Sequence, residues 1–420
     1  KPDRAGGLFI GKLLLAADRG VRVRLLLDDI FTTAPDSAMA LLNTHPNVQV
    51  RLFNPMSRQS FKYWNYALDF RRANRRMHNK SFTVDNALTI VGGRNIAEEY
   101  FELNANVQFD DYEVMAAGPV VAEVSQGFDA FWNSDLAVPM EAFDIKVDSN
   151  DLQEWREQMR AIIADSEQGL YARAVNSPLI QDLMARRREP AVAEAVLVTD
   201  SPEKLQGAVG DAELATLAME IGRRFRAADT QILIITPYFI PGKNGVELLS
   251  ELIDKGVQVI VVTNSLASTN HVPVHSGYAR YRKQLLQAGA HIYEIKADAV
   301  SVSEDSPENP ETLTLHSKAT IIDRDTIFIG SLNFDPRSIV HNSEMGLFIE
   351  SGETGREFSR VVAESMSRVT YRVTLDERGK LQWQYAADDT AEILDNEPLS
   401  TFGRRFMARF YGLLPIESQL

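Results

Sequence analysis

Apolar positions along the chain follow two alternating patterns. Residues 8–20, "LFIGKLLLAADRG", have helical spacing and end at a glycine, and a near-continuous apolar run, "VRVRLLLDD", follows. Residues 252–265, "LIDKGVQVIVVTNS", repeat this order, and a second run, "QILIITPYF" (231–239), precedes them. Such runs predict strands buried on both faces, and their alternation with helices predicts an α/β fold in which helices cover a sheet.

The first half lacks one element that the second half has. The run 231–239 precedes a predicted helix at 245–255, whereas residues 1–7, "KPDRAGG", lead directly into the first helix. The chain also begins at Lys1 rather than at Met. We therefore expect residues upstream of Lys1 in the natural protein, holding the counterpart strand and any targeting signal.

The length of 420 residues predicts two domains, each with its own core. We predict a first repeat at 1–150 without its first strand and a second repeat at 206–365. Between them, 151–205 is charged and helical in period and predicts a helical connector. Residues 366–420 form a predicted C-terminal extension with a helix at 354–368 leading into it and a short strand, "LQWQYA".

Charge and composition exclude several classes of protein. The chain carries 44 basic and 58 acidic residues, a formal net charge of −14, which argues against a surface built for nucleic acid. It has no cysteine, so a disulfide, a thiolate metal site and a cysteine nucleophile are excluded. The longest apolar runs have about half of the ~20 residues that a membrane-spanning helix needs.

Five polar and glycine positions occur twice in the same order and spacing, although the chain has only seven histidines. Each pair is separated by 238 residues: His78 and His316, Lys80 and Lys318, Asp85 and Asp323, Gly92 and Gly330, Asn95 and Asn333. A single His-x-Lys is at least as often part of an ordinary exposed strand edge as part of a functional site. A bare duplication would keep apolar positions, but it need not keep His, Lys, Asp and Asn together, so the repeat indicates shared chemistry.

The residue types suit a phosphate. His and Lys two positions apart on a strand point to the same face, and the glycines allow backbone amides to approach a phosphate oxygen. Two half-sites would place two imidazoles and two ammonium groups on one phosphate. A neutral imidazole can attack phosphorus, a protonated one can donate to the leaving alkoxide, and the lysines can neutralise the equatorial oxygens without a metal or other cofactor. The spacing does not say which histidine takes which role.

These are HxKxxxxD motifs, and they resemble those of the phospholipase D superfamily. The segment "GSLNFDPRSIVHNSEMGLFIE" (330–350) resembles the phosphatidyltransferase branch that contains bacterial cardiolipin synthases. The combination of "ITPYFIPG" (235–242), "VHSGYARYRKQLLQAGAHIYE" (274–294) and a closing "EPLSTFGRRF…LLPIESQL" is similar to the C type of these enzymes. The resemblance implies two phospholipase D-like domains related by a pseudo-twofold axis. Each would be a mixed β-sheet flanked by helices, with the active site at the interface of the two.

The resemblance also implies a ping-pong mechanism through a covalent phosphohistidine. His78 would be the nucleophile, and His316 the general acid and then the base. The implied catalytic set is His78, Lys80, Asp85, His316, Lys318 and Asp323, with Asp111 and Glu344 orienting the imidazoles. Asp110 stands where relatives often have Arg. The candidate substrate-binding residues are Gly93, Asn95, Ser331, Asn333, Tyr238, His275 and Tyr278, and Gly93 opposite Ser331 predicts two unequal phosphate cradles.

The implied function is a phosphatidyltransferase that forms cardiolipin from phosphatidylglycerol and a second phospholipid, either phosphatidylethanolamine or phosphatidylglycerol. Competing hypotheses are a phospholipase D-type hydrolase, a nuclease or phosphodiesterase of the superfamily, and a silent lipid-binding module. The expected partners are phospholipids and a membrane surface, without a stable nucleic-acid partner, and the oligomeric state is open. We expect association with the bacterial inner membrane, either peripheral or through a lipid anchor upstream of Lys1, on a face that the sequence does not specify.

The sequence allows two hypotheses for each of two basic segments. Arg71, Arg72, Arg75 and Arg76 precede His78, either as a positive patch for an anionic headgroup or as a solvated helix end. In the tail, Phe402, Phe406 and Phe410 recur every four residues, with Arg404, Arg405 and Arg409 on other faces. That helix could lie on a membrane surface, or it could dock on the protein's own core.

Overall fold

The computed structural model describes residues 1–58, 69–104, 106–148, 150–167, 169–187, 189–207, 215–299, 311–387 and 390–420. The chain divides into two compact units. Unit 1 contains residues 1–77, 95–103 and 128–192, and unit 2 contains residues 78–94, 104–127 and 193–420. Both copies of the His-x-Lys motif therefore lie in unit 2. The domain boundaries inferred from the sequence stay predictions.

Unit 1 is built on a three-stranded sheet with β1 (Val23–Asp28) parallel to β2 (Val48–Phe53) and β8 (Ala137–Pro139) antiparallel to it. Its core joins side chains of α1, β2 and α6, including Leu14, Leu52 and Leu152. The helices are α1 (Arg4–Asp18), α2 (Asp36–Asn43), α4 (Phe70–Ala73), α6 (Asp151–Glu167), α7 (Leu170–Val175) and α8 (Pro178–Met184), with β3 (Arg76–Met77), η1 (Glu98–Tyr100) and η2 (Met140–Phe143). The helices α6, α7 and α8 of the predicted connector thus belong to unit 1, apart from residues that the structure leaves undescribed.

Two of the four arginines before His78 are buried, whereas Arg71 is exposed. Arg76 is fully buried and pairs with Asp28 at 3.4 Å, and Arg75 is buried as well. Arg72 pairs with Asp69 on the short helix α4. A buried guanidinium requires such a partner, so the pair of Arg76 with Asp28 stabilises unit 1. Neither of the two hypotheses for this run, a positive surface patch or a solvated helix end, applies to Arg75 and Arg76.

Unit 2 contains a mixed sheet whose ten described strands run in the order β20-β19-β18-β12-β11-β10-β14-β15-β17-β9. Within it, β10 pairs in parallel with β11 and β11 with β12, and the other described neighbours are antiparallel. The bounds are β9 (Glu194–Thr199), β10 (Gln231–Ile235), β11 (Gln258–Asn264), β12 (His291–Ile295), β14 (Ala319–Ile322), β15 (Thr326–Gly330), β17 (Met345–Glu350), β18 (Thr370–Leu375), β19 (Leu381–Ala387) and β20 (Thr390–Leu394). The predicted mixed sheet is confirmed, and the predicted extension supplies the strands β18, β19 and β20 at one of its edges.

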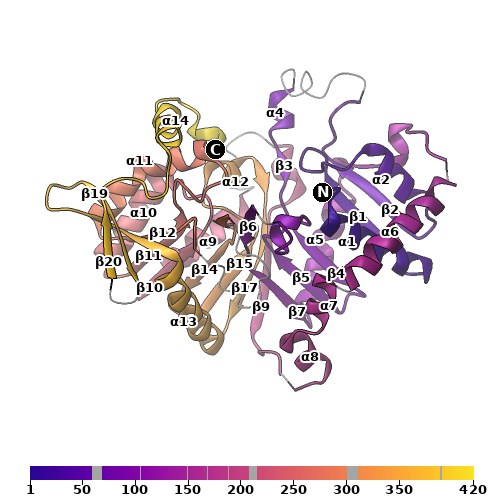
Figure 1. Cartoon of the computed structure of the whole chain (residues 1–420), viewed down its shortest axis with the longest axis horizontal. Coiled ribbons are helices and arrows are strands. Elements are labelled where there is room, and N and C mark those ends of the chain that lie inside the picture. The colour runs from indigo at the N-terminus through magenta and orange to yellow at the C-terminus, as the bar shows by residue number, and fades with distance from the viewer. Residues whose placement is uncertain are drawn as a thin grey trace. The chain divides into compact units, whose positions relative to one another are not determined.

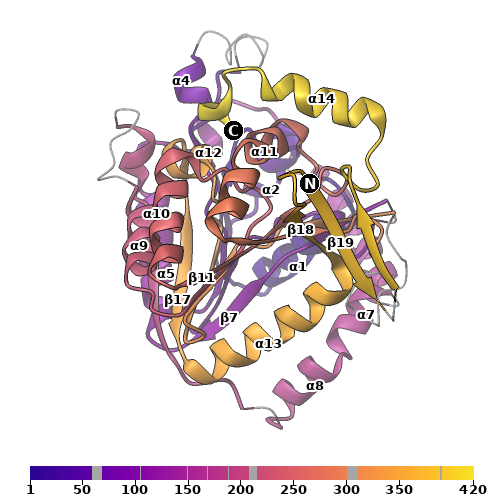
Figure 2. The ribbon, with the colours of Figure 1, turned by 90° about the vertical axis from the view of Figure 1, so that its left-hand side faces the viewer.

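Helices cover both faces of this sheet (Figures 1 and 2). Ile232 and Ile234 of β10 face the helices α9 (Thr216–Arg226), α10 (Gly242–Asp254) and α11 (Val272–Ala288). Leu233 and Ile235 face α13 (Gly352–Val369). Alternate residues of a strand point to opposite faces, which is why the sequence of β10 is apolar throughout.

A second sheet in unit 2 carries the first motif. It consists of β4 (Ser81–Val84), β5 (Leu88–Gly92) and β7 (Glu113–Ala117). Val91 of β5 and Val124 of α5 (Val120–Trp132) pack with Leu347 of β17 in one core. Beside it, β6 (Val107–Asp110) pairs in parallel with β13 (Thr312–Leu315), the strand before His316. These contacts connect the two motif copies.

The remaining elements of unit 2 are η3 (Pro202–Leu205), α12 (Pro336–Val340), β16 (Asn342–Ser343), α14 (Phe402–Gly412) and η5 (Glu417–Gln419). Helix α14 lies along α11 (Figures 1 and 2). Within the described residues, every helix is too short or too polar to cross a bilayer.

Candidate active site

The first imidazole is held by a buried glutamate. The backbone N–H of His78 donates to the Ser343 carbonyl at 3.0 Å, and the ring Nδ1 lies 2.8 Å from Oε2 of Glu344. The Ser331 hydroxyl donates to the same Oε2 at 2.5 Å. Because Nδ1–H is used by the carboxylate, Nε2 of His78 keeps its lone pair.

Glu344 is fully buried and is fixed by further polar contacts. Its backbone N–H donates to Asp200 Oδ2 at 3.0 Å, and Lys204 neutralises Asp200 at 2.7 Å. Burial raises the pKa of Glu344, but His78, Lys80 and the Ser331 hydroxyl outweigh it, and the pKa lies below its ordinary value. The carboxylate is therefore an anion at neutral pH.

The second imidazole is held by an aspartate. The backbone N–H of His316 donates to the Asp110 carbonyl at 2.8 Å, and its Nδ1 lies 2.7 Å from Oδ2 of Asp111. Lys318 Nζ lies 2.7 Å from the same Nδ1 and 3.2 Å from Nε2. One ring nitrogen cannot donate to Asp111 and accept from Lys318 at once, so we assign the proton of Nδ1 to the Asp111 bond and a lone pair to Nε2.

The two motif copies act on each other electrostatically. Burial lowers the pKa of His78, and burial together with Lys318, Lys80 and His78 lowers that of His316 well below its ordinary value. Burial lowers the pKa of Lys318 to about 7, and burial raises the pKa of Asp111 to about 6. Both imidazoles are thus neutral at pH 7. An anion bound between these groups would raise the pKa values of Lys318 and His316 again.

The motif aspartates lie at turns instead. Asp323 lies at the opposite end of β14 from Lys318, and its carboxylate accepts from the backbone N–H groups of Asp229 (3.0 Å), Thr230 (2.7 Å) and Gln231 (3.0 Å). Asp85 takes the same place after β4 and is exposed. Both adopt left-handed backbone conformations, with φ of 53° and 54°. Among the described residues the structure brings neither carboxylate to an imidazole, which differs from the catalytic role expected for them.

Residues 8–132 and 221–367 match the family described as "Cardiolipin synthase, PLD-like domain". The chain belongs to this family. It is 37% identical over 419 residues to cardiolipin synthase C of Escherichia coli, covering 99% of this chain and 88% of that protein. It is 24% identical to cardiolipin synthase B of Salmonella typhi, covering 87% and 71%. The crystal structure of a phosphatidylserine synthase from Haemophilus influenzae has the same fold, with a TM-score of 0.54 at 12% identity over 99% of this chain and 94% of that one. The expected superfamily and α/β fold class are confirmed.

Gly93, Asn95, Ser331 and Asn333 are the candidate phosphate-binding residues of the two motif copies. All of them except Asn95 lie in unit 2. A Cβ atom on Gly93 would meet Asp111 Oδ1 at 2.6 Å, whereas Ser331 places its hydroxyl on Glu344. Asn333 is buried, and its Oδ1 has no hydrogen-bond partner in the described part of the chain. Asn95 belongs to unit 1, where its amide donates to the Tyr100 hydroxyl at 2.9 Å.

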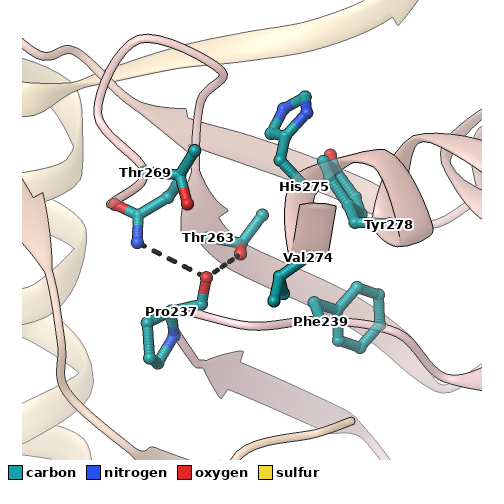
Figure 3. Close-up of a pocket in the computed structure, with 8 residues that line it drawn as sticks. Pro237, Phe239, Thr263, Thr269, Val274, His275 and Tyr278 are labelled. Carbon is teal, nitrogen blue, oxygen red and sulfur yellow. Dashed lines mark hydrogen bonds between the residues drawn. The ribbon is translucent and has the colours of Figure 1, made fainter. Parts of the chain in front are cut away.

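A small pocket lies beside the second motif, at the carboxyl ends of β10 and β11 (Figure 3). His275 lines it from the first turn of α11, and neither ring nitrogen has a partner among the described residues. Tyr278 also lines it, but its hydroxyl donates to Glu294 at 2.8 Å. Asn264 connects the pocket to the site, because its side chain makes two hydrogen bonds of 2.9 Å with Leu315, the residue before His316.

Tyr238 lies next to this pocket rather than in its lining. Its hydroxyl donates to Asn270 Oδ1 at 2.9 Å, and its ring meets that of His271 edge-on at 5.7 Å. The substrate-binding roles of Tyr238, His275 and Tyr278 stay predictions.

Two features were not found from the sequence. Arg94 donates to Glu113 at 2.7 Å and to the Asp111 carbonyl at 3.0 Å, so its charge lies beside the second imidazole. Its position directly after the glycine pair was the one available signal.

The second missed feature is a buried cluster in which ligand atoms of His275, Glu294 and Glu397 lie within 4.8 Å of one another, close enough to hold a metal ion. Arg282 contacts both carboxylates, at 2.7 Å to Glu294 and 2.6 Å to Glu397. The guanidinium already supplies the positive charge that a metal would bring.

Proposed function

We propose that this protein is a phosphatidyltransferase that forms cardiolipin from phosphatidylglycerol and a second phospholipid. The observation that carries the proposal is the paired arrangement of His78 on Glu344 and His316 on Asp111, each with Nδ1 within 2.8 Å of a buried carboxylate. Two imidazoles in one electrostatic field with two lysines suit a double displacement at a phosphodiester. Membership of the cardiolipin synthase family supports the lipid substrate.

In the first step, Nε2 of His78 attacks the phosphorus of the donor lipid. The new N–P bond forms as the bond from phosphorus to the headgroup oxygen breaks, and His316 gives a proton to that oxygen. We assign the nucleophile to His78 because the pKa of its partner Glu344 is lowered, whereas burial raises that of Asp111 to about 6. Glu344 therefore stays charged over the wider pH range and stabilises the positive charge that develops on the His78 ring. His316 is neutral in the free enzyme, and the bound phosphodiester raises its pKa so that it can act as the acid.

In the second step, His316 accepts the proton of a terminal hydroxyl of phosphatidylglycerol. The resulting oxygen attacks phosphorus, and the bond to His78 breaks, which releases cardiolipin, regenerates neutral His78 and leaves His316 protonated. His316 returns to its neutral form as the anionic product leaves and its pKa falls again. Water in place of the lipid hydroxyl would give phosphatidic acid. Lys80 and Lys318 neutralise the non-bridging oxygens in both steps. The Oδ1 atom of Asn333, which has no hydrogen-bond partner among the described residues, is a candidate acceptor for a substrate hydroxyl.

The partners of this reaction are bilayer lipids, so we propose a membrane-associated enzyme at the bacterial inner membrane. The second phospholipid is phosphatidylethanolamine or phosphatidylglycerol. The active-site groups supply the nucleophile, the acid and the charge neutralisation themselves, so the reaction needs no cofactor in this proposal.

The test is an assay in mixed micelles with a chelator present, using labelled phosphatidylglycerol with and without phosphatidylethanolamine. We expect cardiolipin from the natural chain and none from His78→Ala or His316→Ala. The matched control is His291→Ala, which removes a histidine of β12 outside the site and should leave the activity unchanged. Phosphatidic acid as the only product would replace the transferase with a hydrolase.

A second experiment tests the covalent intermediate. An enzyme that holds the phosphatidyl group on His78 exchanges labelled free glycerol into phosphatidylglycerol without net synthesis. His78→Ala should abolish this exchange. Net synthesis without any exchange would argue for direct transfer between two bound lipids and against the phosphohistidine.

A further inference from the structure

Helix α14 presents an apolar face to solvent. Phe402, Phe406, Phe410 and Leu413, here called the aromatic face, have exposed fractions of 78%, 58%, 47% and 83%. Their spacing places them along one side of the helix, and no residue of α14 is buried. A row of large exposed apolar side chains on one helix is unusual for a surface without a partner.

The helix is attached to unit 2 by its polar side, which turns the aromatic face outward. Near its start, the Arg404 guanidinium donates to the carbonyls of Leu266 (2.5 Å) and Thr269. Past its end, Arg280 of α11 donates to the carbonyl of Gly412 at 2.5 Å and that of Leu414 at 2.9 Å. Carbonyls at a helix C-terminus carry partial negative charge, so this guanidinium also stabilises the end of α14.

Both ends of the tail join segments that carry catalytic groups. The loop that binds Arg404 also accepts, at the Ser268 carbonyl, a 2.7 Å hydrogen bond from Thr314, two residues before His316. At the other end the Leu420 carbonyl accepts from the Arg337 backbone at 2.8 Å, and the Ser418 carbonyl lies 3.1 Å from His341, three residues before Glu344. The aromatic face is therefore tied to the segments that hold both imidazoles.

The charge of α14 is opposite to that of the chain. The sequence "FGRRFMARFYG" contains three arginines and no acid, within a chain of net charge −14. Arg409 is exposed and makes no ion pair in the described part of the chain. Aromatic side chains flanked by arginine fit a surface of apolar chains beneath anionic headgroups.

We propose that the aromatic face of α14 is the surface by which this enzyme binds an anionic phospholipid bilayer. The phenyl rings enter the acyl boundary and Arg409 contacts the headgroups. The choice of a bilayer as partner rests on the proposed function, because lipid substrates must be withdrawn from a membrane. The sequence left two hypotheses for this helix, docking on the protein's own core and contact with a membrane. In the proposal, the polar side of α14 docks on unit 2 and its apolar side contacts the membrane.

The test is sedimentation of the full chain with vesicles of phosphatidylglycerol and phosphatidylcholine, and with vesicles of phosphatidylcholine alone. The variant is Phe402→Ser, Phe406→Ser and Phe410→Ser combined. The matched control is Met219→Ser, Val361→Ser and Ile393→Ser, which removes three side chains exposed by 47%, 45% and 57% on other elements of unit 2. We expect the variant to lose at least about tenfold in vesicle partitioning and the control to bind as the natural chain does. Arg409→Glu should weaken binding to anionic vesicles alone.

Binding is measured in a His316→Ala background, so it does not depend on catalysis. Activity is measured separately on a short-chain phosphatidylglycerol that is monomeric in water, where the Phe variant should equal the natural chain. Equal vesicle binding by the Phe variant and the control would overturn the membrane face. A change from dimer to monomer in the Phe variant with unchanged vesicle binding would assign the face to a second copy instead. If the Phe variant loses vesicle binding but the natural chain shows no transferase activity on any lipid, the aromatic face still binds membranes and the proposed function is wrong.

Discussion

A Cβ atom on Gly93 would lie 2.6 Å from Oδ1 of Asp111, closer than a Cβ atom and a non-bonded oxygen approach in real proteins. At the equivalent place in the second copy, Ser331 donates its hydroxyl to Glu344 at 2.5 Å. The shorter acid thus goes with glycine and the longer acid with serine. Each combination brings a carboxylate to the Nδ1 atom of the opposite motif's imidazole, so the two unequal cradles are two solutions to one requirement.

Gly93→Ser should lower the activity more than Ser331→Gly, the reverse substitution at the equivalent position. The added Cβ pushes Asp111 away from His316, and a displacement near 1 Å at a catalytic group can cost about 10²-fold in rate. Ser331→Gly removes one hydrogen bond from Glu344 and creates no clash, so we expect a smaller loss. The measurement is kcat for cardiolipin formation by both variants, with thermal midpoints to show that both fold. Equal losses would contradict the steric argument.

The pH dependence of kcat/KM should report Asp111 and Lys318. The pKa of Asp111 is raised to about 6 by burial, and below it the protonated acid no longer stabilises a charged His316, so activity should fall as the pH drops through about 6. Burial lowers the pKa of Lys318 to about 7, so activity should also fall as the pH rises through that value. Profiles on water-soluble lipid test this. The kcat profile should extend further to alkaline pH, because bound phosphodiester keeps Lys318 protonated. A kcat/KM profile flat from pH 5 to 9 would exclude both assignments.

Asp111→Asn should stabilise the fold while removing activity. A carboxyl whose folded pKa is raised from 3.8 to about 6 contributes stability at low pH that is lost as the pH rises through this range. At neutral pH the buried anion therefore costs up to about 3 kcal/mol, part of which the amide recovers. Urea unfolding at pH 7.5 should give a higher midpoint for the variant, and the difference should shrink at pH 4.5. A lower midpoint at pH 7.5 would mean that the hydrogen bonds of the carboxylate dominate.

The motif aspartates should behave as structural residues. Burial raises the pKa of Asp323, but hydrogen bonds from Asp229, Gln231 and Thr230 outweigh it and the net pKa is lowered. Its contribution to stability is present above its unfolded pKa and is lost as the pH falls through the folded value. Asp323→Ala should lower the free energy of unfolding by about 1 to 3 kcal/mol with kcat nearly unchanged. Asp323→Asn, which keeps one acceptor oxygen, should lose less, and Asp85→Ala should change little. A loss of kcat without a loss of stability would restore the catalytic role.

The sequence predicted those parts of the molecule that depend on local patterns. Apolar runs located β10 and β11, and the repeated motif located His78, Lys80, His316 and Lys318. Strand β10 ends at Ile235, earlier than its apolar run, because Pro237 cannot donate to a neighbouring strand. The role of Asp323 was not predictable, since its partners lie more than 90 positions away and are backbone groups, which leave no trace in residue type.

The cluster around Arg282 shows the same limit and gives the last prediction. Glu294 and Glu397 are 12 and 115 positions from this arginine, and only folding reveals that one guanidinium contacts both. Arg282→Met should cost about 3 to 5 kcal/mol, because the buried Glu294 and the partly buried Glu397 lose their cation. Adding Glu397→Gln to that variant should recover part of the loss, as one negative charge is removed. Thermal midpoints of the two single variants and the double variant measure this coupling. Recovery of the Arg282→Met midpoint by a divalent cation would show that His275 and the two carboxylates can hold a metal ion once the guanidinium is gone, whereas additive losses would mean that the three charges are independent.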